Sequence, residues 1–303
     1  MSRQRGGYIG FNRVPAAAAF NSAASGVWTL REAESLKRAG TWPASLPQIP
    51  TISGLQLHLD AADPATLFDA TTGGSLVAAD GGVARWEDKS GNARHFTQSE
   101  STKRPQRKTA QQNGLDALLF DGSNDSLTGS DFLDGNVGGT TAFVVLKRNA
   151  TGALHGILTK GTTNGGWVFR ITDTNKLNGG SWSDATFANS TDVSSSGTVT
   201  ATGYTAFAWK HTAGSFHTQQ FFRNGTSVAT AAAVEAGTGS RTLPNISDVM
   251  RIGVQRYDGE LAAPGDYFIY NGNIAEIILY DSALSDTDRG LVESYLLSKW
   301  GIT

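Results

Sequence analysis

The chain has 303 residues, a formal net charge of −2 and only 17% charged residues, so no basic surface indicates nucleic-acid binding. It contains 36 glycines, no cysteine and 39% apolar residues, which is typical of a folded, turn-rich all-β protein. The lack of cysteine excludes disulfide scaffolds, cysteine-ligated zinc and thiol nucleophiles. No run of 18 apolar residues occurs, so we expect no membrane insertion.

The first 24 residues are rich in Gly, Ala, Ser and Asn without a sustained period, which predicts an extended arm. A short helix should follow, because Thr29 and Glu32 form a capping box and Gly40 is placed to end it. A helix of about ten residues is too short to be stable alone in water. We therefore expect it to dock on a partner through four apolar side chains: Trp28, Leu30, Leu36 and Trp42.

Three prolines, at positions 43, 47 and 50, form a semi-stiff spacer after this helix. We place the domain boundary there, with an arm and attachment helix over residues 1–48 and a β domain over residues 49–303. Leu55, Leu57 and Leu59 then alternate with polar residues, as in a half-buried strand.

Further strands are predicted from short apolar or aromatic runs between turn signals. They are "LDALLFDG", "TAFVVLKR", "GGWVFRITD", "YTAFAWKHTAG" and "GNIAEIILYDSALS". Asn224 and Gly225 predict a type I′ hairpin. The last element should be an amphipathic helix capped by Ser285 and ended by Gly301, packed on the outside or edge of the sandwich.

Four phrases in the chain carry a resemblance to a known fold. They are "WEDKSGNARHF" (86–96), "LLFDGSNDSL" (118–127), "FFRNGTSVA" (221–229) and "IAEIILYDSALSDTDRGLVESYLLSKWGI" (274–302). In this order, over roughly residues 54–303, they resemble the concanavalin A-like, laminin-G-type jelly roll. The resemblance implies an antiparallel two-sheet sandwich, a fold that hosts lectins, glycosidases, adhesins and virion proteins alike.

The leading phrase "GGYIG…P…SGVWTLREAESLKRAGTWP" resembles the segments that precede such jelly rolls in structural proteins of tailed bacteriophages. The early arginines have no apolar core behind them, which does not fit a signal peptide. We therefore expect a virion component of the tail or capsid decoration, assembled in the host cytoplasm and self-associating. Residues 1–48 would contact other virion proteins, and the jelly roll would meet a host-surface polysaccharide.

Two alternatives stay open: a bacterial carbohydrate-binding adhesin and a glycoside-acting enzyme. Glucanases of this fold carry an E-x-D-x-x-E strand, which is absent here, and Glu87 and Asp88 are adjacent and so face opposite sides of a strand. The histidines show no H-x-x-x-H or H-E-x-x-H spacing. We expect no enzymatic activity and no cofactor beyond a structural calcium ion.

The resemblance implies that a structural calcium ion is common in this fold. Candidate oxygen ligands lie in two turns and on the closing strand: Asp88, Asn92, Asp121, Asn124, Asp125 and Glu276. Calcium takes six to eight oxygens, so these residues do not complete a shell by themselves. The alternative, which the residue types favour, is that Asp and Asn stabilise the turns through their backbone.

A sugar-binding surface is predicted around the stretch "RITDTNKLNGGSWSD". Trp167 and Trp182 flank it and would stack on sugar rings, while Asn178 would supply hydrogen bonds. The alternative is that both tryptophans belong to the sandwich core.

Overall fold

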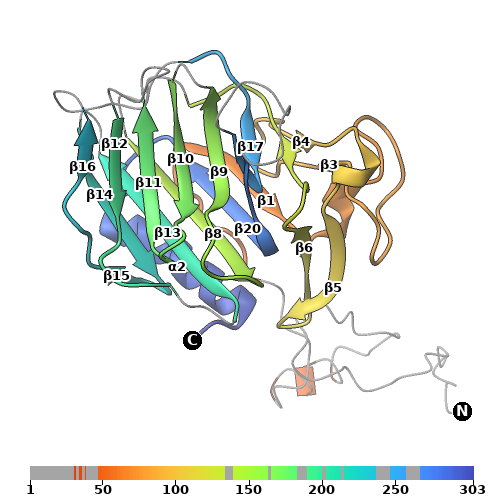
Figure 1. Ribbon diagram of the computed structural model, residues 1–303. Helices are drawn as coiled ribbons and strands as arrows, with labels where there is room; N and C mark the ends of the chain where they lie inside the picture. The colour runs from red at the N-terminus through yellow and green to blue at the C-terminus, as the bar shows by residue number, and fades with distance from the viewer. Residues whose placement is uncertain are drawn as a thin grey trace, which may run out of the picture.

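Two antiparallel sheets face each other in a sandwich, and a helix covers the outer face of one of them (Figure 1). This confirms the predicted all-β jelly roll with a C-terminal helix. The computed structural model describes residues 47–133, 139–162, 165–182, 190–199, 203–212, 215–236, 246–256 and 267–303, with Arg31, Glu34, Ser35 and Arg38. Those four leading residues are helical, and Arg38 pairs with Glu34 at 2.6 Å.

The first ten strands are β1 (Leu55–Asp60), β2 (Leu67–Phe68), β3 (Arg85–Trp86), β4 (Phe96–Thr97), β5 (Gln106–Gln112), β6 (Leu115–Asp121), β7 (Leu127–Thr128), β8 (Thr140–Arg148), β9 (His155–Thr162) and β10 (Gly165–Ile171). The others are β11 (Leu177–Trp182), β12 (Ser190–Ser194), β13 (Thr205–Thr212), β14 (Ser215–Arg223), β15 (Thr226–Val228), β16 (Val234–Ala236), β17 (Met250–Ile252), β18 (Val254–Arg256), β19 (Tyr267–Ile269) and β20 (Asn271–Tyr280). Two short 3-10 helices, η1 (Pro64–Thr66) and η2 (Ser101–Lys103), precede the C-terminal helix α2 (Asp286–Trp300).

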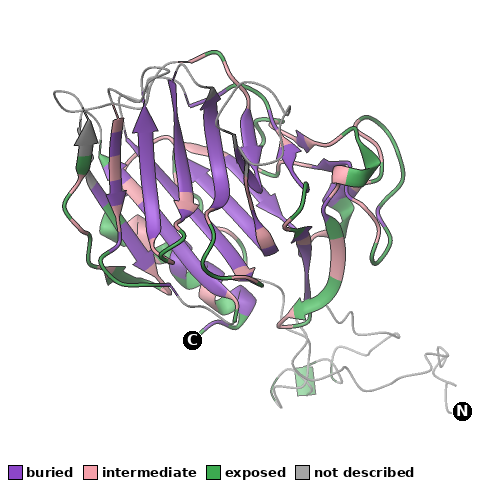
Figure 2. Cartoon of the chain, in the orientation of Figure 1, coloured by how far each residue is buried: buried purple, intermediate pink, exposed green. Residues whose placement is uncertain are grey.

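The eight-stranded sheet runs in the order β15-β14-β13-β8-β20-β6-β5, with β1 also paired to β20. The ten-stranded sheet runs β16-β12-β11-β10-β9-β17-β7-β4-β3-β2, and β18 pairs with β19 as a separate ribbon. Side chains along most of both sheets are buried (Figure 2). No helix among the described residues is long and apolar enough to span a membrane.

The core has two parts, one on each side of the eight-stranded sheet. The part between the sheets holds Trp86, Trp167 and Trp209, all fully buried. The other part lies under α2, where Leu296 and Trp300 pack against the outer face of the sheet. The molecule is therefore three layers thick.

The predicted caps of α2 and the predicted hairpin turn are confirmed. Ser285 accepts a hydrogen bond from the Asp288 amide, and Gly301 ends the helix with φ 58°. Asn224 and Gly225 connect β14 to β15 with φ values of 48° and 78°, as a type I′ turn requires.

Strand β20 contains a register shift between Ile274 and Glu276 where it pairs with β8. Ile274 and Ile277 both lie in the core between the sheets although three positions separate them. Such a bulge re-aims a side chain. Here it turns Glu276 toward the outer face, under α2.

Candidate functional site

A cluster of buried polar side chains lies between the eight-stranded sheet and the C-terminal half of α2. His58 and Asp60 come from β1, and the register places Asp60 opposite Glu276 of β20. Tyr295 and Lys299 are four residues apart in α2, so they share one face of the helix. All five side chains are buried.

The Glu276 carboxylate is fully buried and is bonded by groups from two elements, β1 and α2. Oε1 lies 2.8 Å from His58 Nε2 and accepts from the Tyr295 hydroxyl at 2.6 Å. Oε2 accepts from Lys299 Nζ at 2.8 Å and from the Trp300 indole at 2.6 Å. Burial alone would raise the pKa of Glu276, but Lys299 and His58 outweigh it and lower that pKa to about 2.

Lys299 occupies the position where a cation would bind. Among the described residues, one trio of His, Asp or Glu has ligand atoms within 4.8 Å of one another, and it is His58, Asp60 and Glu276. Lys299 Nζ already lies 2.7 Å from Asp60 Oδ1 and 2.8 Å from Glu276 Oε2. The donor set therefore fits an internal ammonium group better than a metal ion.

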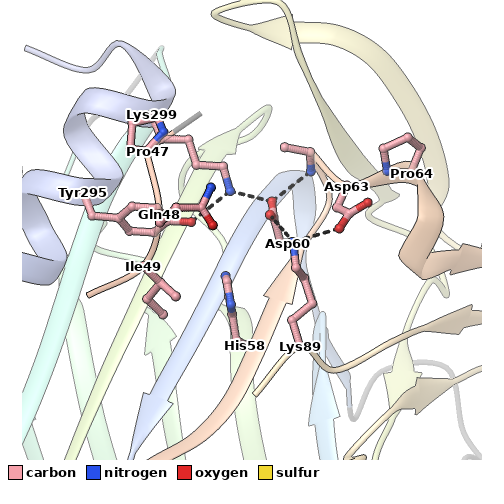
Figure 3. A pocket seen from close by; sticks show the side chains of 11 residues that line it. Pro47, Gln48, Ile49, His58, Asp60, Asp63, Pro64, Lys89, Tyr295 and Lys299 are labelled. Carbon is pink, nitrogen blue, oxygen red and sulfur yellow. Dashed lines mark hydrogen bonds and ion pairs between the residues drawn. The ribbon is translucent and has the colours of Figure 1, made fainter. Parts of the chain in front are cut away.

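A cavity of about 540 Å³ opens beside this cluster (Figure 3). We call it the Asp60 cavity; its lining is Pro47, Gln48, Ile49, His58, Asp60, Ala62, Asp63, Pro64, Lys89, Tyr295 and Lys299. Its volume lies within the roughly 300–1,000 Å³ usual for small-molecule sites. One wall is thus charged, and the leading segment 47–49 forms another side.

An ion pair at the cavity wall is partly open to solvent. Lys89 Nζ lies 2.8 Å from Asp63 Oδ2 and 3.1 Å from Asp60 Oδ2, and the Asp63 and Lys89 side chains are 36% and 32% exposed. Burial would raise the pKa of Asp63, yet Lys89 lowers it. Burial would lower the pKa of Lys89, yet Asp60 and Asp63 raise it. Both groups therefore stay charged at neutral pH.

Both oxygens of Asp60 are bonded as well. Oδ1 accepts from Lys299 and from the Ala62 amide, and Oδ2 accepts from Lys89. Glu276 accepts from four donors and Asp60 from three, so both carboxylates hold neighbouring side chains in position. The carboxylates of Asp60 and Asp63 at the cavity wall are both engaged in ion pairs.

The side chains of the first predicted calcium turn are bonded to the backbone of the turn and of the neighbouring β1. Asp88 Oδ1 accepts from the amides of His58 and Ser90, and Oδ2 accepts from the Arg94 amide. Asn92 donates to the carbonyls of Leu55 and Gln56. These bonds match the turn-stabilising alternative.

The second predicted turn behaves in the same way. Asp121 Oδ1 accepts from the amides of Ser123 and Asn124, and Asp125 Oδ2 accepts from the Asp121 amide. Burial raises the pKa of Asp125 to about 7. Among the described residues, the trio with ligand atoms close together is His58, Asp60 and Glu276. Glu276 is the one predicted calcium ligand in it, so the structure does not bring the predicted set together.

The predicted sugar-binding residues lie on opposite faces of the ten-stranded sheet. Trp167 is fully buried between the sheets, with its ring centroid 5.6 Å from that of Trp209. The alternative core interpretation therefore holds for Trp167, because its ring cannot meet a sugar.

Trp182 lines a hollow of about 70 Å³ with Arg170, Ser190, Asp192 and other residues. Only 6% of Trp182 is exposed. Arg170 donates to Asn178 Oδ1 at 2.7 Å and to Asp192 Oδ1 at 2.9 Å. This hollow is much smaller than the Asp60 cavity.

The four predicted partner-binding residues, Trp28, Leu30, Leu36 and Trp42, lie outside the described residues. The boundary predicted after residue 48 stays a prediction. Ile49 and Ile52 are partly buried and pack against the core part under α2.

Most residues of the Asp60 cavity, among them His58, Asp60 and Lys299, carry no motif that predicts a site. The alternation of apolar and polar residues in β1 predicts that His58 and Asp60 face solvent. Both are instead buried under α2. One signal was present: Lys299 follows Tyr295 by four residues and lies on the buried side of the helix.

No family model matches the chain, and no curated protein matches it by sequence. Among solved structures it is similar to a Trypanosoma rangeli sialidase in complex with 2,3-difluorosialic acid (12% identity, TM-score 0.50, covering 85% of this chain and 34% of that chain). It is also similar to the binding domain of botulinum neurotoxin serotype D (10% identity, TM-score 0.50, 80% and 51%). A third match comes from work on botulinum neurotoxin type C, whose cell entry depends on two ganglioside molecules (11% identity, TM-score 0.50, 80% and 51%). The chain spans between a third and about half of these chains, and identities this low show a shared fold alone.

Proposed function

We propose that this chain is a carbohydrate-binding jelly-roll protein that binds glycans in the Asp60 cavity and has no enzymatic activity. The observation that carries the proposal is a cavity of about 540 Å³ in which charged donors and acceptors lie beside apolar walls. Sugars present both hydroxyl groups and apolar ring faces, so a site of this mixed character suits them.

The ion pair between Asp63 and Lys89 supplies the hydrogen-bonding edge. Adjacent sugar hydroxyls each donate and accept, so one can donate to a carboxylate while its neighbour accepts from an ammonium group. Asp63 Oδ2 and Lys89 Nζ are 2.8 Å apart and about one third exposed. Charge-assisted bonds of this kind are roughly twice as strong as neutral ones.

The structural neighbours agree with a sugar ligand without demonstrating one. A sialidase bound to a sialic acid derivative and a toxin whose entry depends on gangliosides share the fold at 11–12% identity. Catalysis is not proposed, because Asp60 and Glu276 are held in ion pairs with Lys299.

We extend the proposal to a bacteriophage virion component, in which the jelly roll adheres to a host-surface polysaccharide. The resemblance of the leading segment to phage structural proteins supports this. Residues 1–48 would attach the protein to its virion neighbours, and several copies would associate. Electron microscopy of particles labelled with an antibody to this protein tests the location, and unlabelled particles would refute it.

A glycan array with the full chain and three variants tests the ligand and its site. Lys89→Gln should reduce binding at least tenfold, because it removes the ammonium group from the Asp63 pair. Lys108→Gln is the matched control, since Lys108 also pairs with an aspartate, Asp80 at 2.7 Å, and is 25% exposed. It should bind like the wild type.

The third variant, Asp192→Asn, alters the smaller hollow beside Trp182. If Asp192→Asn abolishes binding and Lys89→Gln does not, the glycan site is that hollow and the assignment to the Asp60 cavity is wrong. If the wild type binds no glycan on the array, carbohydrate binding itself is wrong. Turnover of a bound polysaccharide would contradict the non-enzymatic assignment.

A further inference from the structure

Arg148 is a buried arginine without a counter-ion among the described residues. It is the last residue of β8, is 4% exposed and alternates with Leu146 and Val144, which line the core between the sheets. Its Nη1 donates to the Val199 carbonyl at 3.3 Å, while Nε and Nη2 have no hydrogen-bond partner. A buried cation left without an anion is strongly unfavourable.

The other two arginines that are buried among the described residues, Arg85 and Arg251, are paired, unlike Arg148. Arg251 is 7% exposed and donates to both oxygens of Asp248, at 2.9 and 3.1 Å. Arg85 is 8% exposed and bonds Glu87 and two backbone carbonyls. At these two positions a carboxylate of the protein itself neutralises the buried arginine.

His155 lies near Arg148 and forms part of its surroundings. It is the first residue of β9, is 2% exposed and pairs with Ile171, a residue of the core between the sheets. Its ring lies edge-on to Tyr270, with centroids 5.8 Å apart. Its Nδ1 donates to the Ile269 carbonyl at 3.1 Å, so Nε2 is an acceptor in the neutral ring and makes no bond to an anion. Burial, followed by the nearby Arg148 charge, lowers the pKa of His155.

The two residues bracket the connection between the sheets. β8 belongs to the eight-stranded sheet and β9 to the ten-stranded sheet, as Figure 1 shows. Residues 149–154 join them, and most of this loop is exposed. The free edge of Arg148 therefore lies just inside an exposed loop, at the end of the sandwich where the chain crosses over.

The free atoms of Arg148 define the chemistry of the missing partner. Nε and Nη2 form one edge of the guanidinium group, with two parallel N–H bonds. That edge matches the two oxygens of a carboxylate, whereas a spherical ion gains nothing from its shape.

We propose that Arg148 forms a carboxylate-binding site beneath the β8–β9 loop, with its Nε/Nη2 edge as the contact. The ligand is a small carboxylate anion or the carboxylate of an acidic sugar. This site shares no lining residue with the Asp60 cavity, and it does not rest on the proposed function.

Thermal unfolding of the full chain in sodium acetate, sodium glucuronate and sodium chloride at equal ionic strength tests the site. Acetate should give a saturable rise in the unfolding midpoint that chloride does not give. A response to glucuronate alone would identify an acidic sugar as the source of the carboxylate. Equal effects of all three salts, or none from either carboxylate, would overturn the proposal.

Arg148→Lys keeps a positive charge and removes the two-bond edge, so it should lose the acetate response. Arg251→Lys is the matched control, because it alters an equally buried arginine that has its own aspartate; it should be less stable and still respond. A crystal structure in acetate gives a readout that needs no variant. Density for a carboxylate on the Nε/Nη2 edge supports the site, and a main-chain carbonyl or water alone on that edge refutes it.

Discussion

The Glu276 carboxylate of β20 is bonded to side chains of β1 and of α2, so it links these three elements. Glu276→Gln keeps the size of the side chain and removes its charge, leaving Lys299 buried with one carboxylate fewer. We expect a loss of about 3–5 kcal/mol in the free energy of unfolding, as for other broken buried pairs. Urea denaturation measures it.

The matched control for Glu276 is Glu87→Gln. Glu87 pairs with Arg85 at 3.1 Å but is 33% exposed, so its loss should cost below about 1 kcal/mol. Similar losses for the two variants would mean that the Glu276 cluster contributes no more than a surface pair.

His211 should make the sandwich sensitive to acid. Burial lowers its pKa to about 4, whereas an unfolded histidine titrates near pH 6.5. Because the pKa of His211 is lower in the folded than in the unfolded protein, folding is favoured above about pH 6.5. This contribution to the free energy of unfolding, about 3 kcal/mol at most, is lost as the pH falls toward about 4. Urea midpoints between pH 7 and pH 4.5 should fall less steeply for His211→Gln than for the wild type, and equal slopes would contradict the assignment.

At the scale of single elements, the helix α2 contains a glycine that packing does not require. A Cβ built on Gly290 meets nothing within 4 Å, so Gly290→Ala should stabilise the protein by about 0.5–1 kcal/mol. Gly225→Ala is the contrast, because Gly225 has φ 78° in the hairpin and alanine is strained there. Thermal unfolding should move the two midpoints in opposite directions; a fall for Gly290→Ala would mean that the helix needs glycine at this position.

Elements whose signals are local could be predicted from the sequence. The cap at Ser285, the helix end at Gly301 and the Asn224-Gly225 turn each depend on a few neighbouring residues, and all three are present. The sandwich followed from ordered strand and turn phrases in the same way.

The candidate site could not be predicted, because it depends on contacts between distant elements. The bulge in β20 turns Glu276 toward α2, and a strict period of two cannot reveal such a shift. The sequence of β1 predicts that His58 and Asp60 lie on the solvent face of a strand. Nothing in β1 indicates that α2, at the other end of the chain, covers this face. Of the residues in this cluster, the sequence pattern predicts a role only for Glu276, as a calcium ligand. That role does not fit the Lys299 ammonium group beside it.

At the scale of the whole molecule, the segment just before β1 belongs to the β domain. Ile49 and Ile52 pack against the core part beneath α2, while Pro47, Gln48 and Ile49 line the Asp60 cavity. The stretch therefore contributes both to stability and to the proposed binding site.

Two truncations should separate the attachment segment from the domain. A chain that begins at Pro47 should unfold at the same urea concentration as the full chain and bind the same glycans. A chain that begins at Gly54 loses the burial of Ile49 and Ile52, which amounts to about 2 kcal/mol for two half-buried side chains, and also loses one side of the cavity. Its urea midpoint and its glycan binding should fall together. If removal of residues 1–46 alone lowers the midpoint by as much, those residues are part of the fold, and the division after residue 48 is wrong.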